Sequence, residues 1–461
     1  MQQSLSLVVL RELCVSVVNP LRSRTLLFLT VGIAAVAYVA AALGLVVLTW
    51  DGAGYVFNSI QRGHPAIPNS RYSDYPFLAV ISLLSLVIND ARWLAGIYGL
   101  VLAVMPLGSL LLCFYFLRGP LLRPLRIWGV LGILLSVLPG QAFLVAEAVQ
   151  LVQVSWAIWA IAAADITGAS LIWLAVLNLF LFFLHPTAAV TYAVTSGLFL
   201  GKAWTANRQR GSAVWLGLVF LGLAAIRLWY ALATANSYER GEESFAENYQ
   251  VFRDALPSLR MLPLVYLLGI VALTGVTRRL SSRRAIWLGG LMFGLLIGYG
   301  LFWAADPRAW ASAFSFRRFV LVGALPLVGL GALHWWYQNR EGDTHRSDDS
   351  PAAFIMLGSA VVFLLVFGTQ AFTWSEELSR FQAALAHSEK PVATVDDLPW
   401  IPGSPLYHWA STPLSCVIQG KQVKTLFALH ASDVSGSKVL LFPGAWFRPR
   451  NRWFEFERKN E

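Results

Sequence analysis

Long apolar runs, separated by short polar or basic segments, dominate the pattern of the chain. Most runs have about 17 to 25 residues, which is the length that an α-helix needs to cross the hydrocarbon core of a bilayer. About eleven membrane spans are therefore predicted, four of them within the almost continuous apolar sequence 128–201. The predicted spans are residues 26–49, 93–117, 128–146, 148–164, 168–184, 187–201, 213–235, 261–277, 285–304, 319–337 and 352–374.

Two segments of the chain differ from this pattern. The first loop, residues 50–92, contains an apolar piece at 77–88 that is too short to cross a membrane, so it is predicted to be a helix in the membrane interface. The last segment, 375–461, mixes short β-type runs with turns and is mostly soluble in character. We therefore predict a membrane domain at 1–374 and a small α+β domain at 375–461.

Composition agrees with a membrane protein. Hydrophobic residues make up 57% of the chain and charged residues only 13%, against about 25% charged residues in soluble domains. The net charge of +10 does not require a nucleic-acid partner, because Lys and Arg gather in the cytoplasmic loops of membrane proteins. The predicted inner segments carry Lys and Arg at more than twice the density of the predicted outer loops. We therefore expect a cytoplasmic N-terminus, with the first loop and the C-terminal domain outside the inner (plasma) membrane.

Several soluble chemistries are not indicated by the sequence. It contains no Walker loop, no glycine-rich dinucleotide motif after a strand and no zinc-type spacing. The three cysteines, Cys14, Cys113 and Cys416, are far apart and form no metal or disulfide pattern. A nucleotide-sugar donor held in a soluble Rossmann domain is therefore not expected.

Asp51 stands directly after the first predicted span, in the string Trp50-Asp51-Gly52-Ala53-Gly54-Tyr55. A carboxylate that is partly shielded from water at a helix end is suited to act as a general base. The alternative is that Asp51 only ends the helix at the level of the lipid headgroups. The loop continues through His64 to Arg71 and Asp74.

This arrangement resembles the beginning of the GT-C glycosyltransferases, a group that includes dolichyl-phosphate-mannose-dependent mannosyltransferases and lipid A aminoarabinose transferases. In that group an Asp at the outer end of the first helix opens a long loop with interfacial helices. The resemblance covers the first 120 residues by pattern and the remaining chain by layout only. It implies a GT-C-like membrane fold, with Asp51 accepting a proton from the acceptor hydroxyl. It also implies a polyprenyl-phosphate sugar as donor, a lipid or glycan as acceptor, and inverting displacement at the anomeric carbon.

Further candidates lie in the same loop. Asp74 is predicted as a second catalytic carboxylate that contacts the acceptor or a divalent metal, and Arg71 as a phosphate ligand, because guanidinium suits phosphate oxygens. The alternative for this pair is a salt bridge within the loop. Tyr55 and His64 are candidate substrate contacts, although a His beside a Pro is also typical of a turn.

Basic residues elsewhere complete the predicted phosphate pocket. Arg317 and Arg318 stand on the predicted outer side, against the inside bias of positive charge, and are expected to clamp the polyprenyl phosphate; contact with lipid headgroups is the alternative. Arg227 lies about two turns from the outer end of its span and is a further candidate. Glu147 and Asp165 are acidic residues near span ends, where they act in the site or face the aqueous boundary.

The leading hypothesis is a membrane glycosyltransferase that acts on the extracytoplasmic face. A transporter or flippase of lipid-linked glycans is the first alternative, but it predicts an internal repeat of spans, which the sequence lacks. A glycan polymerase or ligase is the second alternative, and it would place key arginines in a large late outer loop. The loop 236–260 is modest in size and more acidic than basic.

Overall fold

The computed structural model describes residues 23–49, 51–65, 72–119, 121–135, 147–205, 209–234, 327–332, 334–335, 350–394, 397, 411–428 and 455–456. Within these residues the protein is mostly helical. Among them, four helices are long and apolar enough to cross a membrane. These helices are Thr25–Leu43, Ala91–Phe116, Arg210–Thr234 and Ile355–His387. The chain is therefore a helical membrane protein, and the total of about eleven spans stays a prediction.

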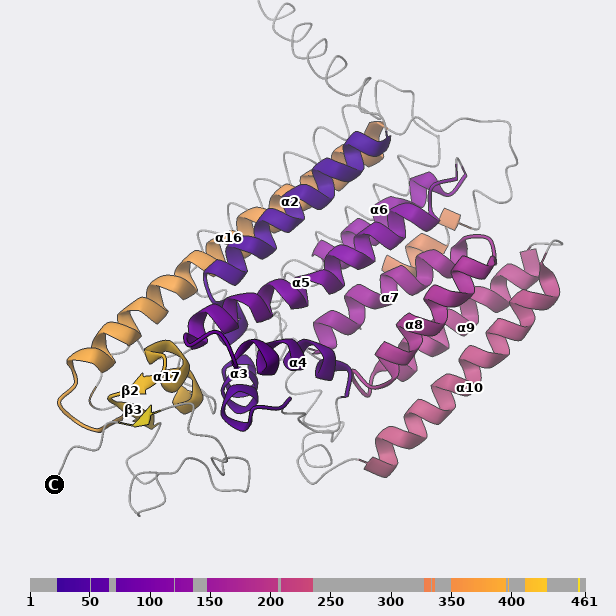
Figure 1. The fold of residues 1–461 in the computed structure, drawn as a ribbon. Helices are drawn as coiled ribbons and strands as arrows, with labels where there is room; N and C mark the ends of the chain where they lie inside the picture. The colour runs from indigo at the N-terminus through magenta and orange to yellow at the C-terminus, as the bar shows by residue number, and fades with distance from the viewer. Residues whose placement is uncertain are drawn as a thin grey trace, which may run out of the picture.

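The long helices lie side by side (Figure 1). In chain order they are α2 (Ser23–Leu43), α5 (Ala91–Phe116), α7 (Glu147–Ala163), α8 (Gly168–Phe182), α9 (Ala188–Thr205), α10 (Arg210–Thr234) and α16 (Ser350–His387). The first and last of these, α2 and α16, pack against each other, and α5 packs between α2 and α7. In turn, α7 contacts α8 and α9, and α9 contacts α10.

Several helices form close to where the apolar runs predict them. The ranges of α7, α8 and α9 follow the predicted spans 148–164, 168–184 and 187–201 within a few residues. The start of α8 is set by Thr167 and Ser170, whose side chains and backbone N–H groups bond reciprocally in a capping box. The predicted spans 261–277 and 285–304 lie outside the described residues.

The first predicted span ends earlier than expected. Its helix, α2, stops at Leu43 because Leu45 adopts a left-handed backbone conformation with φ 56°, which a non-glycine residue seldom takes. A 3-10 turn, η1 (Val46–Leu48), follows, and a new helix, α3 (Asp51–Arg62), then begins. The prediction of one helix over 26–49 was therefore wrong at its C-terminal end.

Two short helices occupy the first predicted loop. The helix predicted over 77–88 is present as α4 (Tyr75–Leu84), which follows the 3-10 turn η2 (Tyr72–Asp74). The other short helix, α3, was not predicted from the sequence by itself, since its Gly, Asn, Ser and Gln residues are typical of a loop. Both helices lie at one end of the long helices (Figure 1). We refer to it as the α3–α4 end.

An irregular helix, residues 123–135, follows α5 in the chain. It consists of the 3-10 turn η3 (Arg123–Leu125), α6 (Arg126–Val130) and the π-helical turn η4 (Leu131–Leu135). The buried guanidinium of Arg126 donates to the carbonyl oxygens of Phe114 and Leu117, both at 2.9 Å. It thereby satisfies carbonyl groups that have no partner at the C-terminal end of a helix.

The last long helix extends past the predicted span 352–374. With 38 residues, α16 is about 57 Å long, well over the roughly 30 Å of a hydrocarbon core. After it come β1 (Val392–Thr394), α17 (Ser411–Gln419), β2 (Gln422–Val423), β3 (Leu426–Ala428) and β4 (Glu455–Phe456), with β1 parallel to β3 and β2 parallel to β4. The helix α17 packs on α3. The predicted boundary at 374/375 falls inside α16, and the division into two domains stays a prediction.

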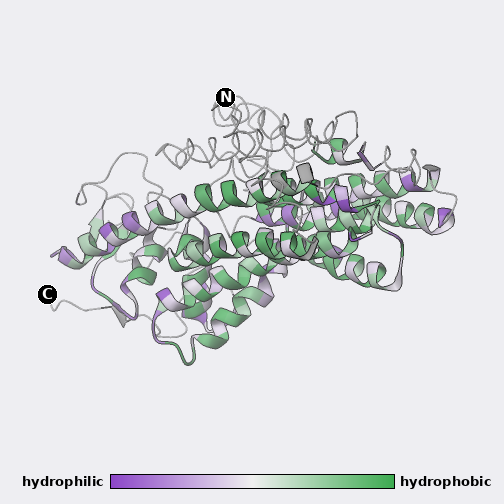
Figure 2. Cartoon of the chain, turned by 90° about the horizontal axis from the view of Figure 1, so that it is seen from above, coloured by the Kyte–Doolittle hydropathy of each residue, from purple (hydrophilic) through white to green (hydrophobic). Residues whose placement is uncertain are grey.

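Apolar side chains cover the outside of the helix array as well as its core. Figure 2 shows hydrophobic residues along most of the length of the helices. On α10, Leu228 and Leu232 are more than half exposed, and so are Trp215 and Trp229 near its two ends. The two tryptophans are separated by about 21 Å along the helix. This distribution is typical of a lipid-facing helix with aromatic residues at both membrane interfaces.

Candidate functional site

Two buried acidic residues from distant parts of the chain lie at the α3–α4 end. Glu147 is the first residue of α7, and the hydroxyl of Tyr55 on α3 donates a hydrogen bond to its Oε1 at 3.0 Å. Asp74 ends the turn η2 and precedes α4. Both carboxyl side chains are at least 97% buried. Burial of an acidic group is costly and typical of functional positions in membrane proteins.

The phenol of Tyr98 lies within electrostatic range of both acidic residues. Tyr98 lies on α5, is fully buried, and is close enough to both Asp74 and Glu147 to interact with them electrostatically. Its hydroxyl makes no hydrogen bond within the described part of the chain. A buried hydroxyl without a partner costs about 1–3 kcal/mol. We name Tyr55, Asp74, Tyr98 and Glu147 the acidic cluster.

Asp51 lies next to the acidic cluster along α3. It is four residues before Tyr55, and residues four apart share one face of a helix. Asp51 is half-buried, and it occupies the first turn of α3, where a negative charge contributes about 0.3–1 kcal/mol of helix stability. The two predicted catalytic residues, Asp51 and Asp74, therefore both belong to the α3–α4 end.

The turn that carries Asp74 is attached to α8. The hydroxyl of Ser73 donates to the carbonyl oxygen of Phe180, and the ring of Tyr72 contacts that of Phe183 edge-on, with ring centres 5.9 Å apart. These contacts hold the turn against the end of α8. The position of Asp74 is therefore set by residues that are more than 100 positions away in the sequence.

Arg227 lies against an aromatic residue at the same end of α8. It is buried on α10, and its guanidinium carbon lies 5.6 Å from the ring centre of Phe182 and 5.4 Å from that of Tyr230. Cation–π contacts of this kind stabilise a guanidinium away from water. Arg227 therefore contacts the same end of α8 to which the turn at Asp74 is bonded.

The remaining predicted site residues lie elsewhere. His64 follows the C-terminal end of α3, with its Nδ1 3.2 Å from the carbonyl oxygen of Pro65. The helix separates that end, at Arg62, from Asp51 by about 16 Å. Arg71, Arg317 and Arg318 lie outside the described residues. Asp165 is exposed in the turn after α7, at the opposite end of that helix from Glu147.

Sequence reasoning missed Tyr98 and the pairing of Tyr55 with Glu147. Tyr98 stands in an apolar helix, where an aromatic residue is usually core, so no local pattern distinguishes it. Glu147 was a candidate because an acidic residue beside an apolar run is costly. Its partner in α3 is 92 residues away, and no spacing rule connects the two.

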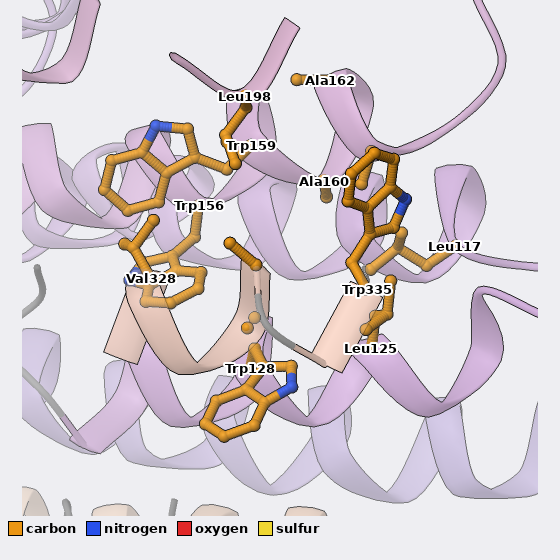
Figure 3. Close-up of a pocket in the computed structure, with 14 residues that line it drawn as sticks. Leu117, Leu125, Trp128, Trp156, Trp159, Ala160, Ala162, Leu198, Val328 and Trp335 are labelled. Atoms are coloured by element: carbon orange, nitrogen blue, oxygen red, sulfur yellow. The ribbon is translucent and has the colours of Figure 1, made fainter. Parts of the chain in front are cut away.

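A second feature, a tryptophan-lined groove, lies toward the other end of the long helices. Its walls include Trp128 on α6, Trp156 and Trp159 on α7 and Trp335 (Figure 3), and it encloses about 60 Å³. The indole N–H of Trp128 donates to Nδ1 of His334 at 3.0 Å. The groove also reaches Leu117, which lies about 28 Å along α5 from Tyr98. The groove is therefore separate from the acidic cluster.

Neither a metal nor a relative identifies the site. Among the residues that were placed, no three His, Cys, Asp or Glu side chains gather as a metal-binding group, so no metal is assigned to Asp74. Comparison of the chain with protein-family models, with curated proteins and with solved structures finds no match.

Proposed function

We propose that this protein is an integral-membrane glycosyltransferase. It would take a sugar from a polyprenyl-phosphate carrier and transfer it to a lipid or glycan acceptor on the extracytoplasmic face of the inner membrane. The observation that carries the proposal is the gathering of Asp51, Asp74 and Glu147 at the end of a membrane-embedded helix array. The short helices α3 and α4, which follow the first span, pack on α5 at that end.

Glycosyl transfer needs the chemistry that these residues supply. The acceptor hydroxyl attacks the anomeric carbon while the bond from that carbon to the phosphate oxygen breaks. A carboxylate near the acceptor takes the hydroxyl proton, and Asp74 and Asp51 are the candidates for this role. Positive charge stabilises the departing phosphate. Among the residues that the structure describes, Arg227 is the candidate for this role. Arg71, Arg317 and Arg318 are candidates from the sequence by itself.

A transfer assay tests this function directly. The purified protein is reconstituted into liposomes with a panel of radiolabelled polyprenyl-phosphate sugars and a membrane lipid extract as acceptor. We expect one donor to yield a labelled product. Asp74→Asn or Asp51→Asn should then reduce the rate by about 100-fold or more, which is the usual contribution of a general base.

The matched control is Asp165→Asn, which removes a carboxylate at the opposite end of α7 and should retain wild-type activity. Full activity in both Asp51→Asn and Asp74→Asn would reject the catalytic assignment. Absence of transfer from every donor would reject the proposed function.

A transporter or flippase is the second candidate, and one observation favours it. The buried Gln153 in the middle of α7 donates to the hydroxyl of Tyr38 at 3.1 Å and to the carbonyl oxygen of Ile133 in the π-helical turn at 3.3 Å. Interrupted helices with polar partners are typical of transport sites. Movement of a lipid-linked sugar between leaflets of the same liposomes, without a transfer product, would support this candidate.

A further inference from the structure

We propose that the exposed face at the end of α4, together with the turn after it, inserts into the hydrocarbon of the membrane. We name this surface, made of Leu83, Leu86 and Val87, the α4 wedge. Its partner is the acyl chains of the surrounding lipids, and it fixes the level of the α3–α4 end in the bilayer. The insertion is independent of the proposed transferase function, whereas its use in catalysis rests on that function.

The polarity of the α4 wedge is opposite to that of a helix that faces water. Leu83, Leu86 and Val87 are between 66% and 76% exposed. Ser82 and Ser85, which alternate with them, are only 4% and 5% exposed. A surface helix of a soluble protein buries its apolar stripe and exposes its polar residues. Contiguous exposed aliphatic side chains beside buried serines therefore indicate contact with an apolar partner.

Hydrogen bonds hold the two serines on the inner side. The hydroxyl of Ser85 donates to the carbonyl oxygen of Ser82 at 2.7 Å, and the hydroxyl of Ser82 donates to that of Leu78 at 3.1 Å. The Ser82 hydroxyl also lies 3.3 Å from the carbonyl oxygen of Ser59 on α3. Both hydroxyls are satisfied, as buried polar groups generally are. The helix is therefore held with its aliphatic side chains outward.

The neighbouring helix α5 shows where the hydrocarbon lies. Exposed residues recur along it at spacings of seven and four positions, which puts them on one face. They are Trp93, Leu100, Val104, Leu111 and Tyr115. The two aromatic residues are about 33 Å apart along the helix, close to the roughly 30 Å of a hydrocarbon core. Because Trp and Tyr are enriched at both membrane interfaces, Trp93 marks the interface at the α3–α4 end.

The α4 wedge continues this lipid-facing surface. The helix α4 packs on α5 (Figure 1), and the chain passes directly from Val87 through Asp90 and Arg92 to Trp93. Asp90 and Arg92 form an ion pair at 3.0 Å, and both side chains are partly exposed. A charged pair beside an exposed tryptophan fits the headgroup layer, and the adjoining aliphatic side chains fit the acyl chains. Lipid is therefore the partner that this surface matches.

Insertion of the α4 wedge fixes the candidate site relative to the lipids. Asp74 immediately precedes α4 and lies about 14 Å along the helix from Leu83. Beside it, Ser73 donates to the carbonyl oxygen of Phe180 at the end of α8. The turn that carries Asp74 is thus held between α8 and the α4 wedge. On the proposed function, this keeps the carboxylate at the level where the phosphate of a lipid-linked donor lies.

Spin labelling in proteoliposomes tests the insertion without any substrate. Leu86→Cys and Val87→Cys are made in a Cys14→Ser background, in which Cys113 and Cys416 are buried, and each variant is labelled with a nitroxide. Collisions are then measured with oxygen, which concentrates in hydrocarbon, and with a water-soluble nickel chelate. We expect collisions with oxygen to predominate at both positions.

Two labelled controls calibrate the measurement. Val104→Cys is on the lipid-facing stripe of α5, and the ratio of oxygen to nickel collisions at positions 86 and 87 should match its ratio. Ala386→Cys is at an exposed position near the end of α16, about 18 Å past Trp374, and its ratio should be several-fold lower. Labels at 86 and 87 that behave like the label at 386 would place the α4 wedge in water and overturn the proposal. Labels that neither reagent reaches would show that protein, such as a second copy of this chain, covers the surface, and would overturn it as well.

A pair of substitutions connects the α4 wedge with the site. Leu86→Asp introduces a charge that is costly in hydrocarbon, whereas the matched control Leu86→Met retains an apolar side chain. We expect Leu86→Asp to lower transfer from a membrane-embedded donor by about tenfold or more, because small misplacements of reacting groups have effects of this size. Leu86→Met should retain the wild-type rate. Equal rates for the two variants would reject the positioning role, and lipid-accessible labels in a protein without any transfer activity would support the insertion and reject the transferase function.

Discussion

The indole N–H of Trp374 donates a hydrogen bond to the carbonyl oxygen of Leu45 at 2.9 Å, across 329 positions of sequence. Leu45 is the left-handed residue that follows the end of α2, and its carbonyl oxygen also accepts a hydrogen bond from the backbone N–H of Leu48 at 2.9 Å. The adjacent Gly44 is equally constrained, since a Cβ atom there would lie 2.8 Å from the carbonyl oxygen of Ala371. The last long helix therefore holds the turn from which α3, with Asp51 and Tyr55, begins.

Replacement of Trp374 should loosen that turn. We expect Trp374→Phe to lower the free energy of unfolding by about 1 kcal/mol, because the carbonyl oxygen of Leu45 loses one of its two donors. Thermal unfolding of the purified protein in detergent measures the change. Trp204→Phe is the control, since Trp204 is 89% exposed and should have little effect. Equal melting temperatures for the two variants would show that the Trp374 bond does not stabilise the turn.

Gly132 in the π-helical turn lies too close to Trp156 to carry a larger side chain. A Cβ atom at Gly132 would lie 1.8 Å from the ring of Trp156, so Gly132→Ala should destabilise the protein by about 1–3 kcal/mol through overpacking. Gly108→Ala on α5 is the matched control, because open space surrounds that position and Ala is the better helix former. The double variant Gly132→Ala/Trp156→Leu should recover part of the loss. A single Gly132→Ala variant as stable as Gly108→Ala would contradict the close packing.

The hydroxyl of Tyr98 should contribute nothing to folding. Tyr98→Phe removes a group that has no hydrogen-bond partner among the described residues, so we expect unchanged or increased thermal stability. Tyr192→Phe should instead lose about 1 kcal/mol, since its hydroxyl donates to the carbonyl oxygen of Asn178 at 2.9 Å. A larger loss in Tyr98→Phe than in Tyr192→Phe would show that the Tyr98 hydroxyl has a stabilising partner.

Low pH should destabilise the N-terminal end of α5, because it protonates the capping residue Asp90. This residue caps the helix by accepting a hydrogen bond from the backbone N–H of Arg92 at 2.9 Å, and it pairs with the Arg92 guanidinium at 3.0 Å. Burial alone would raise the pKa of Asp90, but the hydrogen bonds and charge of Arg92 outweigh it and lower the pKa below its ordinary value. The stabilising effect is therefore complete above the pKa of the unfolded chain, about 3.9, and is lost as the pH falls through the lower folded pKa.

The Asp90→Ala variant checks this contribution. It should lose about 1 kcal/mol of stability near neutral pH, as for other N-cap substitutions. The difference from wild type should shrink as the pH falls below the ordinary range of Asp, when melting temperatures are compared across a pH series. A difference that stays constant down to the most acid pH would rule out ionised Asp90 as its cause.

The membrane helices were predictable because their main signal is local. A run of apolar residues of sufficient length forms a helix in a bilayer whatever its neighbours are, since every backbone polar group must be satisfied inside the segment. This is why α5 and α7 to α10 appear close to their predicted ranges. The short helix α4 was predictable for the same reason, from an apolar piece of insufficient length.

The acidic cluster and the end of α2 depend on contacts between distant segments. Nothing in residues 26–49 shows that the helix stops at Leu43, because the cause is the close approach of α16 at Gly44 and the bond from Trp374. Likewise, α3 has the composition of a loop and is a buried helix because α4, α5 and α17 pack on it. Apolar patterning is a property of single segments, whereas the pairing of Tyr55 with Glu147 requires two helices to be placed side by side. Only tertiary packing determines that placement.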